Sequence, residues 1–223
     1  MSAYFLKHHR FFKKRIDQIP YSIESTIAEI DTLFFKTYKW YEIYNFIEAC
    51  IEYFPFDEKK EDFIILLNDC LEIENSAYRV INYQITPITS EQEIQSIEQA
   101  IENTNPYSGV QQHLNQALKL MSDRQNPDYR NSIKESISAL EGICKIIANK
   151  ENAGFQETLA IIQNKYDLHK SLKEGFVKFY GYTSNGDGIR HAMLEESNLS
   201  YIDAKFMLVA CTNFINYLIE KTK

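Results

Sequence analysis

Residues 184–191 combine three kinds of side chain and backbone that could bind or transform a phosphate ester. Gly186 and Gly188 free the chain for left-handed conformations and for close approach to a ligand. Arg190 can hold a phosphate through two parallel hydrogen bonds, and His191 can exchange a proton near neutral pH. This segment therefore predicts a glycine-rich turn between two helices with a candidate site on it.

The order of residues in the turn favours an anion as the ligand. A helix that begins near Ile189 would direct its first amide groups toward the turn, where the helix dipole is positive. Asn185, Gly186, Asp187 and Gly188 are accordingly the candidate binding residues. An ordinary interhelical loop with a surface Arg-His pair is the competing interpretation.

Neither a P-loop nor a calcium-binding loop fits this segment. A P-loop requires Lys after its last glycine, and Gly188 is followed by Ile189. A calcium loop with Gly188 at its sixth position requires acidic residues where Thr183 and Leu194 stand. We therefore expect no metal in the turn.

A second candidate, Glu141, lies in the longest run of helical periodicity. Its neighbours at 139–143 are small or apolar, and a partly buried carboxylate needs a partner. Lys145, one helical turn later, is the simplest partner. We take Glu141 as a candidate catalytic residue and Lys145 as a candidate binding residue.

Apolar residues at helical spacing run through most of the chain and predict an all-α fold. We expect four helices over residues 3 to about 75, two between Ser90 and about 125, a long one over 129–147, shorter ones near 155–165 and 168–180, and a last one from Ser200. The exception is a short β-hairpin near 78–87, where β-branched and aromatic residues flank Asn82-Tyr83. Two helical subdomains are expected, with their boundary within 103–127.

Composition restricts the class of protein further. The 223 residues are 44% apolar and 13% aromatic, enough for a packed core, and the net charge of −7 excludes a protein that coats nucleic acid through overall basicity. The four cysteines, at 50, 70, 144 and 211, lack zinc or disulfide spacing, and we expect buried thiols in a reducing compartment. With no leader segment and no apolar run of about 20 residues, we expect a cytoplasmic protein without a membrane partner, metal or other cofactor.

Several strings of the sequence carry a resemblance to known families. Residues 40–48 (WYEIYNFIE), 74–79 (ENSAYR) and 85–89 (ITPIT) resemble one class of N-terminal domain of AbiJ-type abortive-infection proteins. Residues 128–137 (DYRNSIKESI) and 185–192 (NGDGIRHA) resemble the helical HEPN-like domain that usually follows it. The resemblance implies an N-terminal domain over 1–104 and a HEPN-like bundle over 105–223.

The resemblance also implies a function. It suggests a bacterial anti-phage protein that responds to a phage-derived trigger, and a HEPN-like bundle that forms a homodimer and, where active, cuts RNA without a metal. The usual HEPN site has an Arg and a polar residue, followed four to six positions later by a His.

This sequence departs from the usual HEPN pattern. No Arg lies within 179–189, and Arg190 adjoins His191, so that on a regular helix their side chains diverge by about 100°. Two hypotheses follow. In the first, the protein is a metal-independent endoribonuclease with a variant site of Arg190, His191 and Glu141. In the second, the bundle is a non-catalytic dimerisation or sensing module that binds RNA, a nucleotide or a protein.

Overall fold

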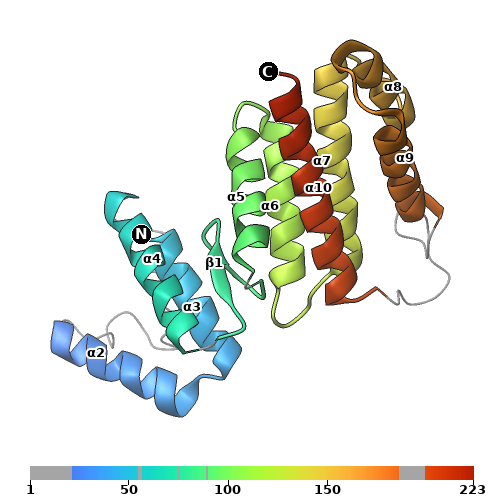
Figure 1. Ribbon diagram of the computed structural model, residues 1–223. Helices are drawn as coiled ribbons and strands as arrows, with labels where there is room; N and C mark the ends of the chain where they lie inside the picture. The colour runs from blue at the N-terminus through green and yellow to red at the C-terminus, as the bar shows by residue number, and fades with distance from the viewer. Residues whose placement is uncertain (1–21, 55–56, 75, 89, 186–198) are drawn as a thin grey trace. The chain divides into compact units, whose positions relative to one another are not determined.

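The computed structural model describes residues 22–54, 57–74, 76–88, 90–185 and 199–223; the first predicted helix lies outside these ranges. The described part consists of helices and one two-stranded hairpin, which confirms the all-α prediction (Figure 1). Packing divides the chain into two compact units, one of residues 1–76 with 83–85 and one of residues 77–82 with 86–223. This division lies upstream of the domain boundary expected at 104 and 105.

The first unit contains the helices α2 (Ile23–Thr32), α3 (Trp40–Glu52) and α4 (Asp57–Ile73), and the π-helical turn η2 (Leu33–Thr37). Ser22 begins α2 as predicted, because its hydroxyl accepts a hydrogen bond from the Ser25 amide. Aromatic rings hold the unit together, with Phe34 edge-on to Phe46. The helical spacing of Trp40, Ile43 and Ile47 predicts a core position for Trp40, and this was wrong. Trp40 is 53% exposed, and its ring lies edge-on to those of Tyr41 and Tyr44.

The predicted hairpin is confirmed as β1 (Arg79–Ile81) paired with β2 (Gln84–Thr86). Asn82 and Tyr83 both have positive φ, as the two central residues of a tight hairpin turn require. Tyr83 is an uncommon residue for that conformation, and its hydroxyl donates to Glu61.

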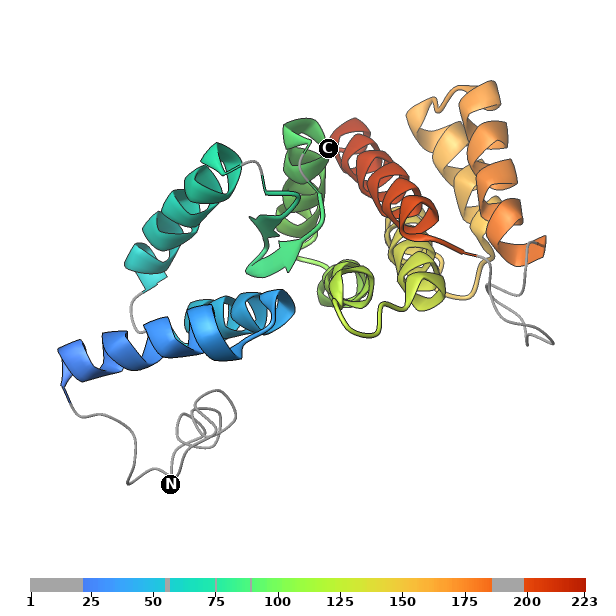
Figure 2. The ribbon, with the colours of Figure 1, turned by 90° about the horizontal axis from the view of Figure 1, so that it is seen from below.

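The second unit is a bundle in which α7 is the central helix. Its members are α5 (Glu91–Asn103), α6 (Ser108–Ser122), α7 (Tyr129–Ala148), α8 (Phe155–Tyr166), α9 (Lys170–Asn185) and α10 (Tyr201–Lys221). α7 packs against α6, α8, α9 and α10, while α5 packs on α10. Figures 1 and 2 agree that the α8–α9 pair lies at the opposite edge of the bundle from α5.

The starts of these helices follow the sequence signals in part. The Ser200 and Asp203 capping box of α10 forms as predicted. The Asn-Pro pairs at 105–106 and 126–127 predict helix starts, because proline fits the first helical position, but both helices begin two residues later. α6 begins after Tyr107, and α7 begins after Asp128, whose carboxylate accepts from the Asn131 amide at 3.0 Å. For α7, the Asp128 carboxylate is as good a cap as Asn126, and it lies two residues closer to the apolar run.

The core of the second unit draws on all of its helices except α9, whose apolar residues pack against it, and on the hairpin. α7 contributes a fully buried stripe, and α10 faces it with a second one; the buried members are Ile133, Ile137, Leu140, Cys144, Met207, Leu208, Cys211 and Ile215. The expected burial of the thiols is confirmed for Cys144 and Cys211 but was wrong for Cys50 and Cys70, which are exposed in the first unit. Periodicity places a residue on a helix face without showing whether that face is covered.

Polar side chains line the contact between α5 and α10. Asn216, almost fully buried, donates to the Ser96 carbonyl at 2.9 Å and accepts from Asn103 at 3.1 Å. At the other end, the Lys205 ammonium pairs with both oxygens of Glu93 at 3.0 and 3.1 Å. The Ser-x-x-Glu spacing of Ser90 and Glu93 predicts a capping box. Ser90 does cap α5, but the described partner of the Glu93 carboxylate is Lys205. These contacts fix the register of α5 on α10.

α10 is the one helix of the described ranges that is long and apolar enough to cross a membrane. The expectation that no segment approaches this composition was therefore wrong. Of its most apolar window, 56% is buried within the bundle, as is usual for the core helix of a folded domain.

Two helical glycines differ in their surroundings and predict opposite outcomes. A Cβ at Gly175 in α9 would meet no atom within 4 Å, whereas a Cβ at Gly142 in α7 would lie 3.1 Å from Cγ2 of Val110. Gly175→Ala is expected to raise the free energy of unfolding by about 0.5–1 kcal/mol because alanine restricts the unfolded chain and favours the helix. In Gly142→Ala, the steric contact of the new Cβ with Val110 should cancel this increase in the free energy of unfolding. Urea denaturation followed by circular dichroism measures both, and equal stabilisation would contradict the close contact.

Candidate functional site

The structure describes only part of the predicted site. Glu141 and Lys145 lie one turn apart on α7, and both are partly buried. Asn185 is the last residue of α9. The remaining candidates, Gly186, Asp187, Gly188, Arg190 and His191, lie outside the described residues. Their roles stay predictions.

The expected end of the helix before the turn was wrong. A helix over 168–180 would leave Gly181 in the turn with Gly186 and Gly188, but α9 continues to Asn185 and includes Gly181. A helical Gly181 needs no positive φ, and a Cβ there would meet open space. The cluster of turn glycines is therefore reduced to Gly186 and Gly188. Helix propensity outweighs one glycine when the surrounding residues pack.

Glu141 has a partner on a different helix from the one predicted. The hydroxyl of Tyr180 in α9 donates to Oε1 of Glu141 at 2.5 Å. Both side chains are partly buried. This hydrogen bond satisfies the need of a half-buried carboxylate for a donor, and it links α7 to α9 five residues before α9 ends.

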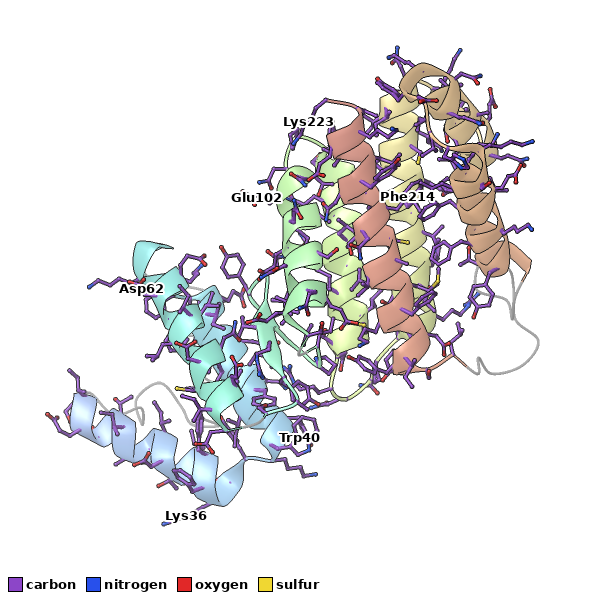
Figure 3. The ribbon with its side chains drawn as sticks, in the orientation of Figure 1. Lys36, Trp40, Asp62, Glu102, Phe214 and Lys223 are labelled. Atoms are coloured by element: carbon purple, nitrogen blue, oxygen red, sulfur yellow. The ribbon has the colours of Figure 1, made fainter. Side chains whose placement is uncertain are left out.

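Aromatic packing holds the Tyr180 ring in place. The ring stacks on that of Phe155, the first residue of α8, with centroids 4.6 Å apart and planes 20° from parallel. Phe155 is itself buried. Earlier in α9, Phe176 stacks on Phe214 of α10, which is labelled in Figure 3, and Phe179 lies edge-on to Phe206. The part of α9 from Phe176 to Tyr180 is thus fixed on α8 and α10 by its rings.

Cys144 lies close to Glu141 on α7 and is buried. Burial, with a smaller contribution from the Glu141 carboxylate, raises the pKa of the Cys144 thiol above its ordinary value. Burial likewise raises the pKa of the Cys211 thiol. Both sulfurs are protonated at neutral pH, which makes them core residues and not nucleophiles.

A second acid-base pair joins α6 to α7. Nδ1 of His113 lies 2.6 Å from Oε2 of Glu135, and the imidazole is 43% exposed. The sequence placed His113 at the surface or half-buried, in agreement with this, but did not connect it to Glu135. Within the part of the chain that the structure describes, His, Cys, Asp and Glu form no group of three that could hold a metal ion.

Tyr180 and Phe155 are the residues of this site that the sequence did not reveal. The sequence indicated that the Glu141 carboxylate needs a partner, and Lys145, one turn later in the same helix, could have been that partner. Tyr180 is 39 residues from Glu141 along the chain, so helical periodicity cannot pair them. Only the packing of α9 on α7 and α8 does so.

Comparison with known proteins gives one family match. Residues 3–103 match the family model of AbiJ N-terminal domain 4. The chain therefore carries an AbiJ-type N-terminal domain, and this suggests a protein of the abortive-infection type. The matched range runs past the first compact unit and includes the hairpin and α5. Neither a curated protein nor a solved structure matches the chain significantly.

Proposed function

We propose that this protein is a bacterial anti-phage abortive-infection factor whose second unit is a HEPN-like endoribonuclease that acts without a metal. The observation that carries the proposal is the AbiJ-type domain over residues 3–103. A phage-derived trigger would release the activity in the cytoplasm, and arrest of the infected cell would follow from cleavage of its RNA.

The proposed chemistry is an intramolecular attack on phosphorus. His191 accepts the proton of a ribose 2′-hydroxyl, and the 2′-oxygen bonds to the adjacent phosphorus as the bond from phosphorus to the 5′-oxygen breaks. The leaving 5′-oxygen takes a proton from water, and the products are a cyclic phosphate and a 5′-hydroxyl. Arg190, the turn of residues 185–188 and the amide groups of residues 189–191 hold the phosphate, and Glu141 orients one of the two catalytic side chains.

The described residues support this assignment at one point. Glu141 is linked to α9 close to the end of that helix, and Arg190 follows only five residues after Asn185. Lys145 adds a positive charge one turn from Glu141 on the same helix.

A homodimer is part of the proposal, because a second copy would supply the second set of catalytic groups. Two large apolar side chains one turn apart on α10 are exposed to solvent: Ile202 is 71% exposed and Phe206 is 62% exposed. Phe179 of α9 adds its ring beside Phe206. Adjacent exposed apolar side chains of this size favour a protein contact surface.

A non-catalytic sensing or dimerisation module is the alternative. One observation favours it: the carboxylate of Glu141 is already bonded to a structural tyrosine, and such a bond also serves simply to fix α9.

Replacement of His191 by alanine separates the two functions. In the nuclease, His191→Ala should lower the rate of RNA cleavage in EDTA by at least about a hundredfold, because it removes the general base. It should also abolish growth arrest in cells that express the protein. His169→Ala, at an exposed position before α9, is the matched control and should retain both activities.

Cleavage and growth arrest that persist unchanged in His191→Ala would exclude this site assignment. Growth arrest without any RNA turnover by the wild-type chain would favour the sensing module.

A further inference from the structure

The hydrogen bond between Tyr180 and Glu141 joins two side chains whose movement is restricted by packing. Its donor ring is stacked on the buried Phe155, and its acceptor lies on the central helix between the buried Leu140 and Ile143. A tyrosine has few rotatable bonds, so the stacked ring leaves its hydroxyl little freedom. The hydroxyl therefore fixes the position of Oε1 of Glu141.

Fixing one oxygen of a carboxylate also fixes the other. The carboxyl group is planar, and once Oε1 is held at 2.5 Å by a donor from α9, rotation about the last side-chain bond is restricted. Glutamate otherwise has three rotatable bonds and would sample many directions. The direction of Oε2 is thus set from outside α7, by a side chain on the helix that leads into residues 186–191.

We propose that Tyr180 is a positioning residue, which holds the carboxylate of Glu141 in the orientation that the site uses. This inference rests on the proposed nuclease function, in which Glu141 orients a catalytic side chain. Preorganised side chains raise the rate of the chemical step more than they improve substrate binding. The inferred role therefore predicts a particular kinetic effect.

Tyr180→Phe tests the role because it keeps the stacked ring and removes only the hydroxyl. In the full-length chain, kcat for cleavage of an RNA oligonucleotide should fall about tenfold, and KM should change less than about twofold. In a Glu141→Gln background, the same substitution should change kcat less than about twofold, since its effect passes through the carboxylate. Tyr217→Phe, at a tyrosine of α10 that is 38% exposed, is the matched control and should leave kcat unchanged.

The outcomes separate this inference from the proposed function. An unchanged kcat in Tyr180→Phe, while His191→Ala is inactive, would overturn the positioning role alone. A tenfold loss that persists in the Glu141→Gln background would also overturn it, because the hydroxyl would then act elsewhere. Absence of any His191-dependent cleavage in the wild-type chain would overturn the proposed function and, with it, this inference. A melting curve of each variant shows that the fold is retained.

Discussion

A chain that begins at residue 105 is expected not to fold, whereas one that begins at residue 77 should fold cooperatively. The core cluster of the second unit includes five side chains from upstream of residue 105, which are Ile81, Ile88, Ile97, Ala100 and Ile101. All five are buried. Burial of one isoleucine contributes about 1.5–3 kcal/mol, so the four isoleucines together are worth roughly 6–12 kcal/mol. That is comparable to the whole stability of a typical domain, about 5–15 kcal/mol.

Loss of α5 would also leave polar groups without partners. Asn216 would lose both the Ser96 carbonyl and the Asn103 amide, and Lys205 would lose Glu93. Thermal melts by circular dichroism, with size-exclusion chromatography for aggregation, measure the two fragments side by side. Equally cooperative melting of both at similar temperatures would show that α5 is dispensable.

Ile137→Ala is expected to lower the free energy of unfolding of the second unit by about 2–5 kcal/mol. Ile137 is fully buried at the centre of α7, where a cavity cannot be filled without moving α6 or α10. The matched control is Ile146→Ala on the same helix, because Ile146 is 45% exposed and its substitution should cost less than about 1 kcal/mol.

Denaturant titration of the full chain measures both isoleucine variants. Because two units can unfold separately, a probe that belongs to the second unit is needed, such as the amide signals of α7. Similar losses for the two substitutions would contradict the central position of α7.

Much of the fold could be predicted from the sequence because its signals are local. The stripe from Tyr129 to Ile147 predicted α7 almost to the residue, and Asn82-Tyr83 located the hairpin turn. Where prediction failed, a non-local contact decided the outcome. Gly181 lies in a helix because its neighbours pack on α8 and α10, and Trp40 is exposed although it lies on an apolar stripe.

The candidate site could be predicted less well than the fold. The apolar neighbours of Glu141 predicted a carboxylate that needs a partner, and this was correct. Helical spacing favoured Lys145 as that partner, whereas the hydroxyl of Tyr180 donates to Glu141 from another helix, 39 residues away in sequence. Pairs of this kind depend on how two helices are placed, and no pattern within either helix encodes that.

The position of α5 limits where this chain could be joined to the C-terminal half of another protein. By sequence, α5 is the last helix of the AbiJ-type domain, but its apolar face and its polar partners belong to α10. A crossover near residue 104 that joined this domain to a different C-terminal half would place Ser96 and Asn103 against a foreign helix without Asn216. A crossover just before the hairpin would keep all three together. A chimaera with a different C-terminal half should therefore fold when the junction lies before residue 78, whereas a junction near residue 104 would need matched changes in α5 and α10.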